Sequence, residues 1–278
     1  MIMKIQFAFS PCPNDTFMFE PIYSKRIDLK GIDFEIIMED VEYLNKAAQR
    51  REFTLTKLSY NAFAGLTEYY QMLDSGSALG RGCGPLVISL KELTAGDLSN
   101  AKIAVPGMHT TAFFLLKYAF PKIKHVSEVH FSEIEQSVLE GKFDAGVIIH
   151  ENRFTYEKRG LKKIVDLGSF WENNTGYPIP LGGIAVLREL DPELKSKINS
   201  IITESVSYAF AHPKSGADFI KEYAQEMDET VMYDHIRLYV NDYSAYLNHE
   251  GRNAVEFLCN KVNDEKEKKT HHPLFVQA

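Results

Sequence analysis

Short apolar runs alternate along the chain with segments whose apolar residues recur at helical spacing. The runs KIQFAFS, DFEIIM and TLTKLS are typical of strands, and each precedes a segment with helical periodicity. In DVEYLNKAAQRRE, for example, Val41, Leu44 and Ala48 share one helical face. We also predict that YNAFAGLTEYY is helical. Strands that alternate with helices are typical of α/β proteins with a mostly parallel sheet, so we predict this fold class.

A polar, turn-rich segment, LKELTAGDLSNAK, separates these elements from a second set. The second set has predicted strands at KIAVPG, EVHFS, FDAGVII and KKIVDLG, and predicted helices at TTAFFLLKYAF and SEIEQSVLEGK. From Asp191 onward the pattern is helical almost to the end. We therefore predict two α/β lobes, one of residues 1–92 with 190–278 and one of residues 93–189. Ligand sites often lie between two such lobes, which predicts a central cleft.

Three of the predicted strands end in small hydroxyl residues beside a helix start. These residues are Ser10, Ser59, Thr110 and Thr111, and Asn14 or Asp15 is expected to cap the helix that follows Ser10. A helix N-terminus offers unpaired N–H groups and the positive end of a dipole, so it binds anions. Ligands of open α/β sheets lie beyond the carboxyl ends of the strands. The pattern predicts a pocket for a small carboxylate or phosphate.

Each of these residues also has a plainer interpretation. The hydroxyl groups could serve only as ordinary helix caps, although capping and anion binding use the same geometry. Lys57 lies in the strand before Ser59, where it is either an exposed strand residue or a charge partner for a substrate carboxylate. Cys12 lies near a helix N-terminus, which lowers a thiol pKa, so it is either a nucleophile or a small turn residue.

His150 is the strongest candidate for catalysis. It directly follows the apolar run FDAGVII, at the carboxyl end of that predicted strand. Histidine is the side chain best suited to proton transfer near neutral pH. The alternative is a histidine that ends the strand or pairs with Glu151. The sequence leaves open the roles of Asn14, His109 and Arg153.

Composition limits the classes of partner. The chain has 278 residues, of which 45% are apolar and 25% charged, as in globular proteins. A net charge of −7 without a long basic stretch argues against nucleic acid as a partner. The three cysteines are widely spaced, and no metal-binding or dinucleotide motif occurs in its proper context. Without a signal-peptide pattern or a long apolar run, we predict a cytoplasmic protein that has no membrane partner. A homodimer is compatible with the sequence.

Four segments together carry a family resemblance over nearly the whole chain. They are SPCPNDTFMF at residues 10–19, KLSYNAF at 57–63, GMHTTAFFLL at 107–116 and DAGVIIHENRFTY at 144–156. In this order they resemble the 1,4-dihydroxy-6-naphthoate synthase family of the futalosine route to menaquinone. The resemblance implies an α/β, two-lobe fold like that of type II periplasmic binding proteins, with a central cleft.

The resemblance also implies an activity and a set of site residues. The expected reaction is that of a lyase, which converts cyclic dehypoxanthinyl futalosine to 1,4-dihydroxy-6-naphthoate with loss of a three-carbon fragment. It implies no metal and no organic cofactor. His150 would be the proton acceptor, a general base. The substrate contacts would come from Lys57, Leu58, Ser59, Thr110 and Thr111.

Two other functions remain open at this stage. One is a chorismate dehydratase-like lyase of the same pathway, whose substrate is also an anionic ring. The other is a protein that binds a small anion without catalysis, because a fold alone does not fix a function.

Overall fold

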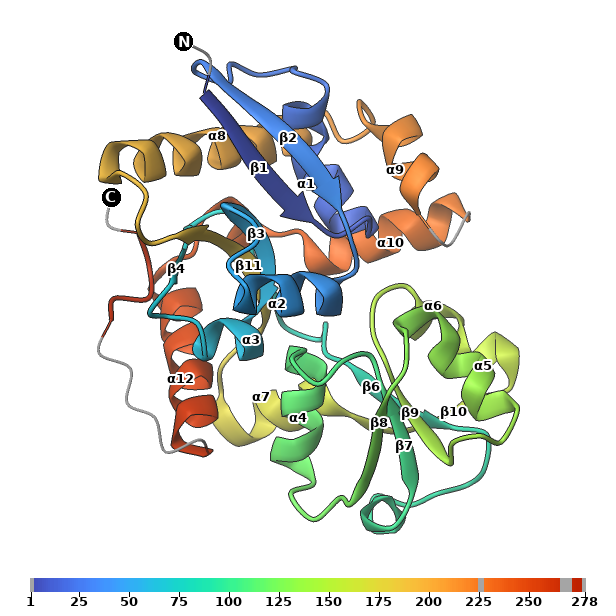
Figure 1. The fold of residues 1–278 in the computed structure, drawn as a ribbon. Coiled ribbons are helices and arrows are strands. Elements are labelled where there is room, and N and C mark those ends of the chain that lie inside the picture. The colour runs from blue at the N-terminus through green and yellow to red at the C-terminus, as the bar shows by residue number, and fades with distance from the viewer. Residues whose placement is uncertain (1–2, 225–227, 266–271, 277–278) are drawn as a thin grey trace. The chain divides into compact units, whose positions relative to one another are not determined.

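The chain forms two compact units. The computed structural model describes residues 3–224, 228–265 and 272–276, shown as a ribbon in Figure 1. Unit 1 comprises Met1–Gly80 with Pro180–Ala278, and unit 2 comprises Arg81–Ile179. Within the described residues, no helix combines the length and the apolar character needed to cross a membrane.

Both crossings between the units come earlier in the chain than the predicted boundaries at residues 92 and 189. The run GPLVISL contains strand β6 (Leu86–Ser89), which pairs with strands of unit 2 rather than unit 1. The run PLGGIAVLREL contains most of strand β11 (Ile179–Leu187), which pairs with strands of unit 1. An apolar run identifies a strand but does not specify the sheet that receives it, so the boundary positions needed the structure.

Unit 1 is built on a six-stranded sheet in the order β2-β1-β3-β11-β4, with β5 paired to β11. Strand β1 runs parallel to β2 and β3, whereas β11 runs antiparallel to β3 and β4. The other strands of this sheet are β1 (Met3–Phe9), β2 (Ile32–Met38), β3 (Leu55–Ser59), β4 (Tyr70–Met72) and β5 (Ala78–Gly80). Its helices are α1 (Pro13–Tyr23), α2 (Val41–Gln49), α3 (Tyr60–Ala64), α8 (Pro192–Ala211), α9 (Ala217–Tyr223), α10 (Glu229–Tyr239), α11 (Asp242–Ala245) and α12 (His249–Glu265).

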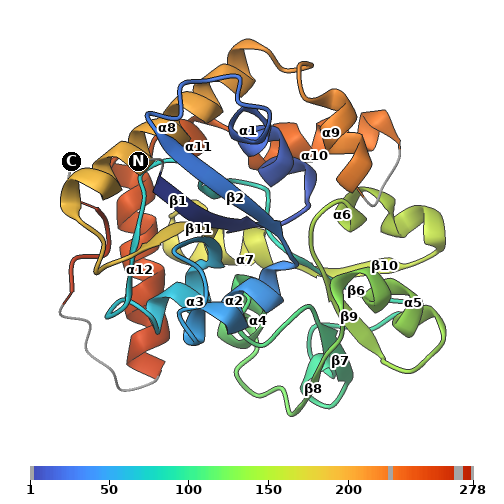
Figure 2. The same cartoon turned by 45° about the horizontal axis from the view of Figure 1, so that its top comes forward.

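Helices cover both faces of the unit 1 sheet (Figure 2). Successive side chains of a strand point to opposite faces, and β1 shows this directly. Phe7 and Phe9 lie in the larger apolar core with residues of α1, α8 and α10, whereas Ala8 packs with Leu44 and Ala47 of α2. Of the predicted helical face of DVEYLNKAAQRRE, Leu44 therefore packs on the sheet, and its neighbour there is Ala47, which was not part of that prediction.

Unit 2 is built on a five-stranded sheet in the order β10-β6-β9-β7-β8. Strand β7 runs parallel to β8 and β9, and β6 runs antiparallel to β9 and β10. The remaining strands are β7 (Lys102–Val105), β8 (His125–Glu128), β9 (Ala145–Ile148) and β10 (Lys162–Asp166). The helices are α4 (Thr111–Ala119), α5 (Ile134–Leu139), α6 (Asn152–Thr155) and α7 (Leu167–Thr175), with short 3-10 turns at Asp97–Ser99, Phe131–Glu133 and Tyr156–Arg159.

Two predicted elements differ from the structure. The segment YNAFAGLTEYY is helical only in α3, which ends at Ala64 with Gly65 as its C-cap, and Tyr70 begins β4. The predicted strand EVHFS lies mostly beyond β8, which ends at Glu128, and Phe131 starts a 3-10 turn. In both places short elements follow each other closely, so the few apolar residues of each element fit the spacing of a helix as well as that of a strand.

Gly84 and Gly168 allow two backbone segments of unit 2 to pass in close contact. A Cβ atom on Gly84 would lie 2.3 Å from the Cα atom of Gly168 and 2.5 Å from its nitrogen. We expect Gly84→Ala to lower the free energy of unfolding by about 1–3 kcal/mol, because backbone must shift. Urea denaturation measures this change. Gly96→Ala is the control, since its nearest contact is an ordinary 3.6 Å, and an equal loss there would contradict the explanation.

Candidate active site

In unit 1, the segment after β1 and the end of β3 lie at the same edge of the sheet, because the two strands are parallel neighbours. The carboxylate of Asp15 gathers the polar groups there. It accepts hydrogen bonds from the backbone N–H and the hydroxyl of Ser10 (3.2 and 2.7 Å) and from the side-chain amide of Asn14 (2.8 Å). Helix α1 begins at Pro13 with Cys12 as its N-cap. The prediction that Asn14 or Asp15 caps this helix is therefore wrong. Asp15 lies in the first helical turn, from which it reaches back to Ser10.

Lys57 also binds Asp15. Its ammonium lies 2.7 Å from the carboxylate Oδ1, and both side chains are almost completely buried. The ammonium donates a second hydrogen bond to the carbonyl of Gly76 (3.3 Å). The interpretation of Lys57 as an exposed strand residue is therefore wrong. A substrate carboxylate at this place would meet an existing ion pair rather than a lone cation.

The other two predicted contacts of β3 are also buried. Leu58 has no exposed surface, and Ser59 is 3% exposed. The backbone N–H of Ser59 donates to the side-chain oxygen of Asn45 (3.0 Å), and its hydroxyl accepts from the amide nitrogen of Asn45 (3.0 Å). Ser59 precedes α3, which has five residues, and makes no side-chain capping bond. The Ser59 hydroxyl, rather than its backbone N–H, is thus the group left for a ligand.

His235 belongs to the same polar cluster and was missed by the sequence analysis. Its Nε2 lies 2.9 Å from the side-chain oxygen of Asn14, and its side chain is fully buried. Because the Asn14 nitrogen donates to Asp15, the Asn14 oxygen faces the imidazole, and Nε2 must carry a hydrogen. His235 comes from α10, and no local pattern in the sequence marks it. Asn14 therefore links an imidazole to the buried ion pair.

In unit 2, the predicted site residues follow two neighbouring strands. Ile103 of β7 pairs with Ala145 of β9 in parallel register. The turn that contains Thr110 follows β7 and His150 follows β9, so both lie at the carboxyl edge of this sheet. This is the edge where ligands of α/β sheets bind. The structure therefore places Thr110, Thr111 and His150 at one edge, as their positions after predicted strands indicated.

Thr110 is the N-cap of α4. Its hydroxyl accepts a hydrogen bond from the backbone N–H of Phe113 (3.2 Å) and donates one to the carbonyl of Gly107 (2.7 Å). The capping interpretation is thus confirmed for Thr110. Thr111 is the first residue of the helix, and both threonines are buried. The turn presents the N-terminus of a nine-residue helix, an arrangement that attracts anions.

His150 has an unusual backbone conformation. Its φ is +58°, in the left-handed region that residues with a Cβ rarely adopt. The side chain is half-buried, and its ring contacts the ring of Phe131 edge-on with 5.1 Å between the centroids. Strained backbone of this kind concentrates at functional sites, where the surrounding structure holds it in place. The conformation and the packing together orient the imidazole at the strand end.

Arg153 ties the segment after His150 to the rest of unit 2. Its guanidinium donates to the carbonyl of Gly84 and lies 3.6 Å from the carboxylate of Asp166. The nearby thiol of Cys83 is buried, and this burial raises its pKa to about 12. Cys83 is therefore protonated at neutral pH and is a poor nucleophile.

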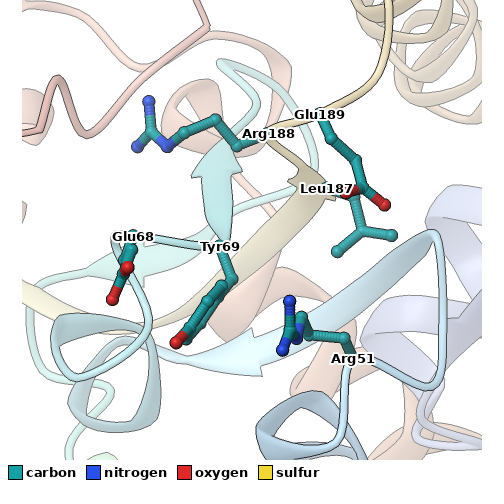
Figure 3. A pocket seen from close by; sticks show the side chains of 6 residues that line it. All are labelled: Arg51, Glu68, Tyr69, Leu187, Arg188 and Glu189. Carbon is teal, nitrogen blue, oxygen red and sulfur yellow. The ribbon is translucent and has the colours of Figure 1, made fainter.

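A pocket of about 280 Å³ lies elsewhere in unit 1, near the amino end of β3 (Figure 3). It is lined by Arg51, Glu68, Tyr69, Leu187, Arg188 and Glu189. The backbone of Leu187 bonds Thr54, just before β3, whereas Ser59 ends that strand. The guanidinium of Arg188 points away from Arg51 and is held by the carbonyls of Thr67, Tyr70 and Pro273. The role of Arg188 is thus structural. None of the predicted site residues lines this pocket.

Similar structures define the class of fold. The aliphatic sulphonate binding protein SsuA of Escherichia coli, a periplasmic protein, matches with a TM-score of 0.67 at 9% identity, over 99% of this chain and 92% of its own. At this identity the match shows the fold alone, and it confirms the predicted α/β fold of the periplasmic-binding-protein type. A solved structure from Archaeoglobus fulgidus matches more closely, with a TM-score of 0.88 and 32% identity over 95% of this chain and 98% of its own.

Sequence comparisons identify the family. A family model described as menaquinone biosynthesis matches residues 5–264. A curated 1,4-dihydroxy-6-naphthoate synthase of Thermus thermophilus is 43% identical over 251 residues, which is 90% of this chain and 91% of the relative. The chain belongs to this menaquinone biosynthesis family. The resemblance predicted from the four sequence segments is thereby confirmed.

Proposed function

We propose that this protein is a lyase that converts cyclic dehypoxanthinyl futalosine to 1,4-dihydroxy-6-naphthoate with loss of a three-carbon fragment. The main support is the edge of the unit 2 sheet, where His150 and the start of α4 follow neighbouring parallel strands. The name and the 43% identity of the Thermus thermophilus relative point to the same reaction. The cytoplasmic location predicted from the sequence stays a prediction.

In the proposed mechanism, His150 is the general base. Its imidazole takes a proton from a substrate hydroxyl or from an acidic C–H bond. Ring opening and loss of the three-carbon fragment follow, and the formation of an aromatic ring drives the reaction forward. General base catalysis contributes about 10²–10⁴-fold to a rate. The rest of the acceleration comes from positioning of the substrate.

We assign the substrate contacts to two groups of residues. In unit 2, the N-terminus of α4 at Thr110 and Thr111 binds an anionic oxygen of the substrate. In unit 1, the end of β3 contributes Lys57, Leu58 and Ser59. The Lys57 ammonium donates to Asp15 and Gly76, so it contributes at most one further hydrogen bond. At the end of β3 we therefore assign the main hydrogen bond to the substrate to the hydroxyl of Ser59 rather than to the ammonium of Lys57.

Incubation of the purified protein with cyclic dehypoxanthinyl futalosine tests the proposal. We expect the mass of 1,4-dihydroxy-6-naphthoate to appear, together with the three-carbon fragment. A parallel incubation with chorismate tests the dehydratase alternative, in which the product is lighter by one water. A protein that binds the futalosine derivative and releases it unchanged would be a binding protein, and the proposed reaction would be wrong.

A further inference from the structure

Asn45 of α2 is fully buried, and both ends of its amide contact Ser59. Its oxygen accepts the hydrogen bond from the backbone N–H of Ser59. Its nitrogen donates to the hydroxyl of Ser59 and to the carboxylate of Glu42 (3.3 Å). One oxygen bond and two nitrogen bonds thus hold this amide in place. Asn45 is therefore a rigid partner for a residue that we assign to the site.

The chemistry of the neighbours fixes the orientation of this amide. A backbone N–H can only donate, so the amide atom that faces Ser59 N must be the oxygen. A carboxylate can only accept, so the atom that faces Glu42 must be the nitrogen. The Ser59 hydroxyl lies on the nitrogen side, and it therefore receives a hydrogen from Asn45.

This contact determines what the Ser59 hydroxyl can do. A serine hydroxyl has one hydrogen and two lone pairs, and it rotates to suit its partners. Asn45 occupies a lone pair, which turns the hydroxyl hydrogen away from the amide. Among the residues that the structure describes, no acceptor for this hydrogen is found. Ser59 is thus preset as a donor at the carboxyl end of β3.

We propose that Asn45 is a positioning residue that holds Ser59 as a hydrogen-bond donor to an anionic oxygen of the substrate, an inference that rests on the proposed function. A donor fixed in this way favours a carboxylate over a group that carries hydrogens. The pairing of Lys57 with Asp15 strengthens the argument, because this buried cation of the same strand is already neutralised by a carboxylate. The preference for an anion then depends on the directed hydroxyl. A hydrogen bond to a charged group is worth enough to change affinity about tenfold to a hundredfold.

Asn45→Asp tests the inference with little change of shape. The variant keeps an acceptor for the Ser59 N–H but offers oxygen in place of the donating nitrogen, so the hydroxyl hydrogen turns inward. We expect KM for cyclic dehypoxanthinyl futalosine to rise about tenfold to a hundredfold, with a smaller change in kcat. Ser59→Ala should raise KM similarly. The double variant should show no more than the effect of Ser59→Ala alone, because Asn45 acts through Ser59.

The two single variants and the double variant form a double-mutant cycle. This cycle separates an effect of Asn45 on the position of the Ser59 hydroxyl from an effect of the new charge on the substrate. If the new charge of Asn45→Asp simply repelled the substrate, its effect would persist beside Ser59→Ala, and the two effects on KM would multiply. That result, or an unchanged KM in Asn45→Asp, would overturn the inference. Asn199→Asp is the matched control, since Asn199 also accepts from a backbone N–H of unit 1, that of Asp74. It should leave KM unchanged.

The same measurements distinguish the two proposals. If the wild-type protein converts the substrate but the effects of the two substitutions on KM multiply, the inference about Asn45 is wrong and the proposed function stands. Wild-type protein that neither binds nor converts the substrate overturns both. Thermal unfolding of each variant checks the fold, and Asn45→Ser, which keeps a small polar side chain, replaces Asn45→Asp in the cycle if that variant does not fold.

Discussion

Replacement of His150 by asparagine is expected to lower kcat by about 10²–10⁴-fold and to leave KM and thermal stability nearly unchanged. Asparagine is chosen because of the backbone of His150, whose φ is +58°. Asparagine tolerates the left-handed region better than most residues with a Cβ, so the turn after β9 should keep its conformation. The imidazole, and with it the proposed base, is lost. This variant separates the chemistry of the site from the shape of the turn.

The measurement is the rate of 1,4-dihydroxy-6-naphthoate formation under saturating substrate. His125→Asn is a suitable control, because His125 is an exposed histidine of β8 in the same unit. His150→Gly adds a second arm, since glycine accepts a positive φ and leaves space for added imidazole. Partial recovery of kcat with imidazole would support a base at this position. Near-normal turnover of His150→Asn would remove His150 from the mechanism.

The sequence predicted the placement of the unit 2 site residues for a physical reason. His150 and Thr110 each follow an apolar run that becomes a parallel strand, and parallel strands end at a common edge. Position relative to a strand end is local information, which the period of apolar residues carries. The left-handed backbone of His150 is different. It depends on the turn as it is folded, and no glycine marks it in the sequence.

The contacts of unit 1 could not be predicted in this way. Asp15 and Lys57 are 42 residues apart, and Asn14 and His235 are 221 apart. Such pairs depend on which strands are neighbours and on how α10 packs, neither of which a local pattern specifies. Lys57 shows the consequence. Its polar character in a strand favoured exposure or a substrate contact, but the buried carboxylate of Asp15 decides its environment.

Strand assignment to a sheet failed for the same reason. The predicted boundaries put the apolar run with β6 in the first lobe and that with most of β11 in the second, but β6 pairs with β9 and β10 of unit 2, and β11 with β3 of unit 1. Each strand lies next to a crossing between the units, so its assignment to the wrong sheet moves the predicted boundary to the other side of that strand. Pairing is a long-range property, so it is visible only in the folded chain.

Removal of one partner of the buried pair formed by Asp15 and Lys57 is expected to cost about 3–5 kcal/mol of unfolding free energy. Asp15→Asn leaves the ammonium of Lys57 buried without a carboxylate, and Lys57→Met leaves the carboxylate buried without its cation. A buried charge without its ion partner loses its hydration, and the hydrogen bonds that remain, from Ser10 and Asn14 to Asp15 or from Lys57 to Gly76, offset only part of that cost. The double variant removes both charges, so its loss should be well below the sum of the two single losses.

Urea unfolding of the two single variants and the double variant measures this coupling. Lys142→Met is the control, because Lys142 pairs with Glu140 at 2.6 Å on the surface, where such a pair is worth about 0–1 kcal/mol. Additive losses in the cycle would contradict a coupled pair. The substrate KM of the double variant then assigns the role of the pair. A stable double variant with a raised KM would mean that Asp15 and Lys57 serve binding at the end of β3, because the fold can do without their charges.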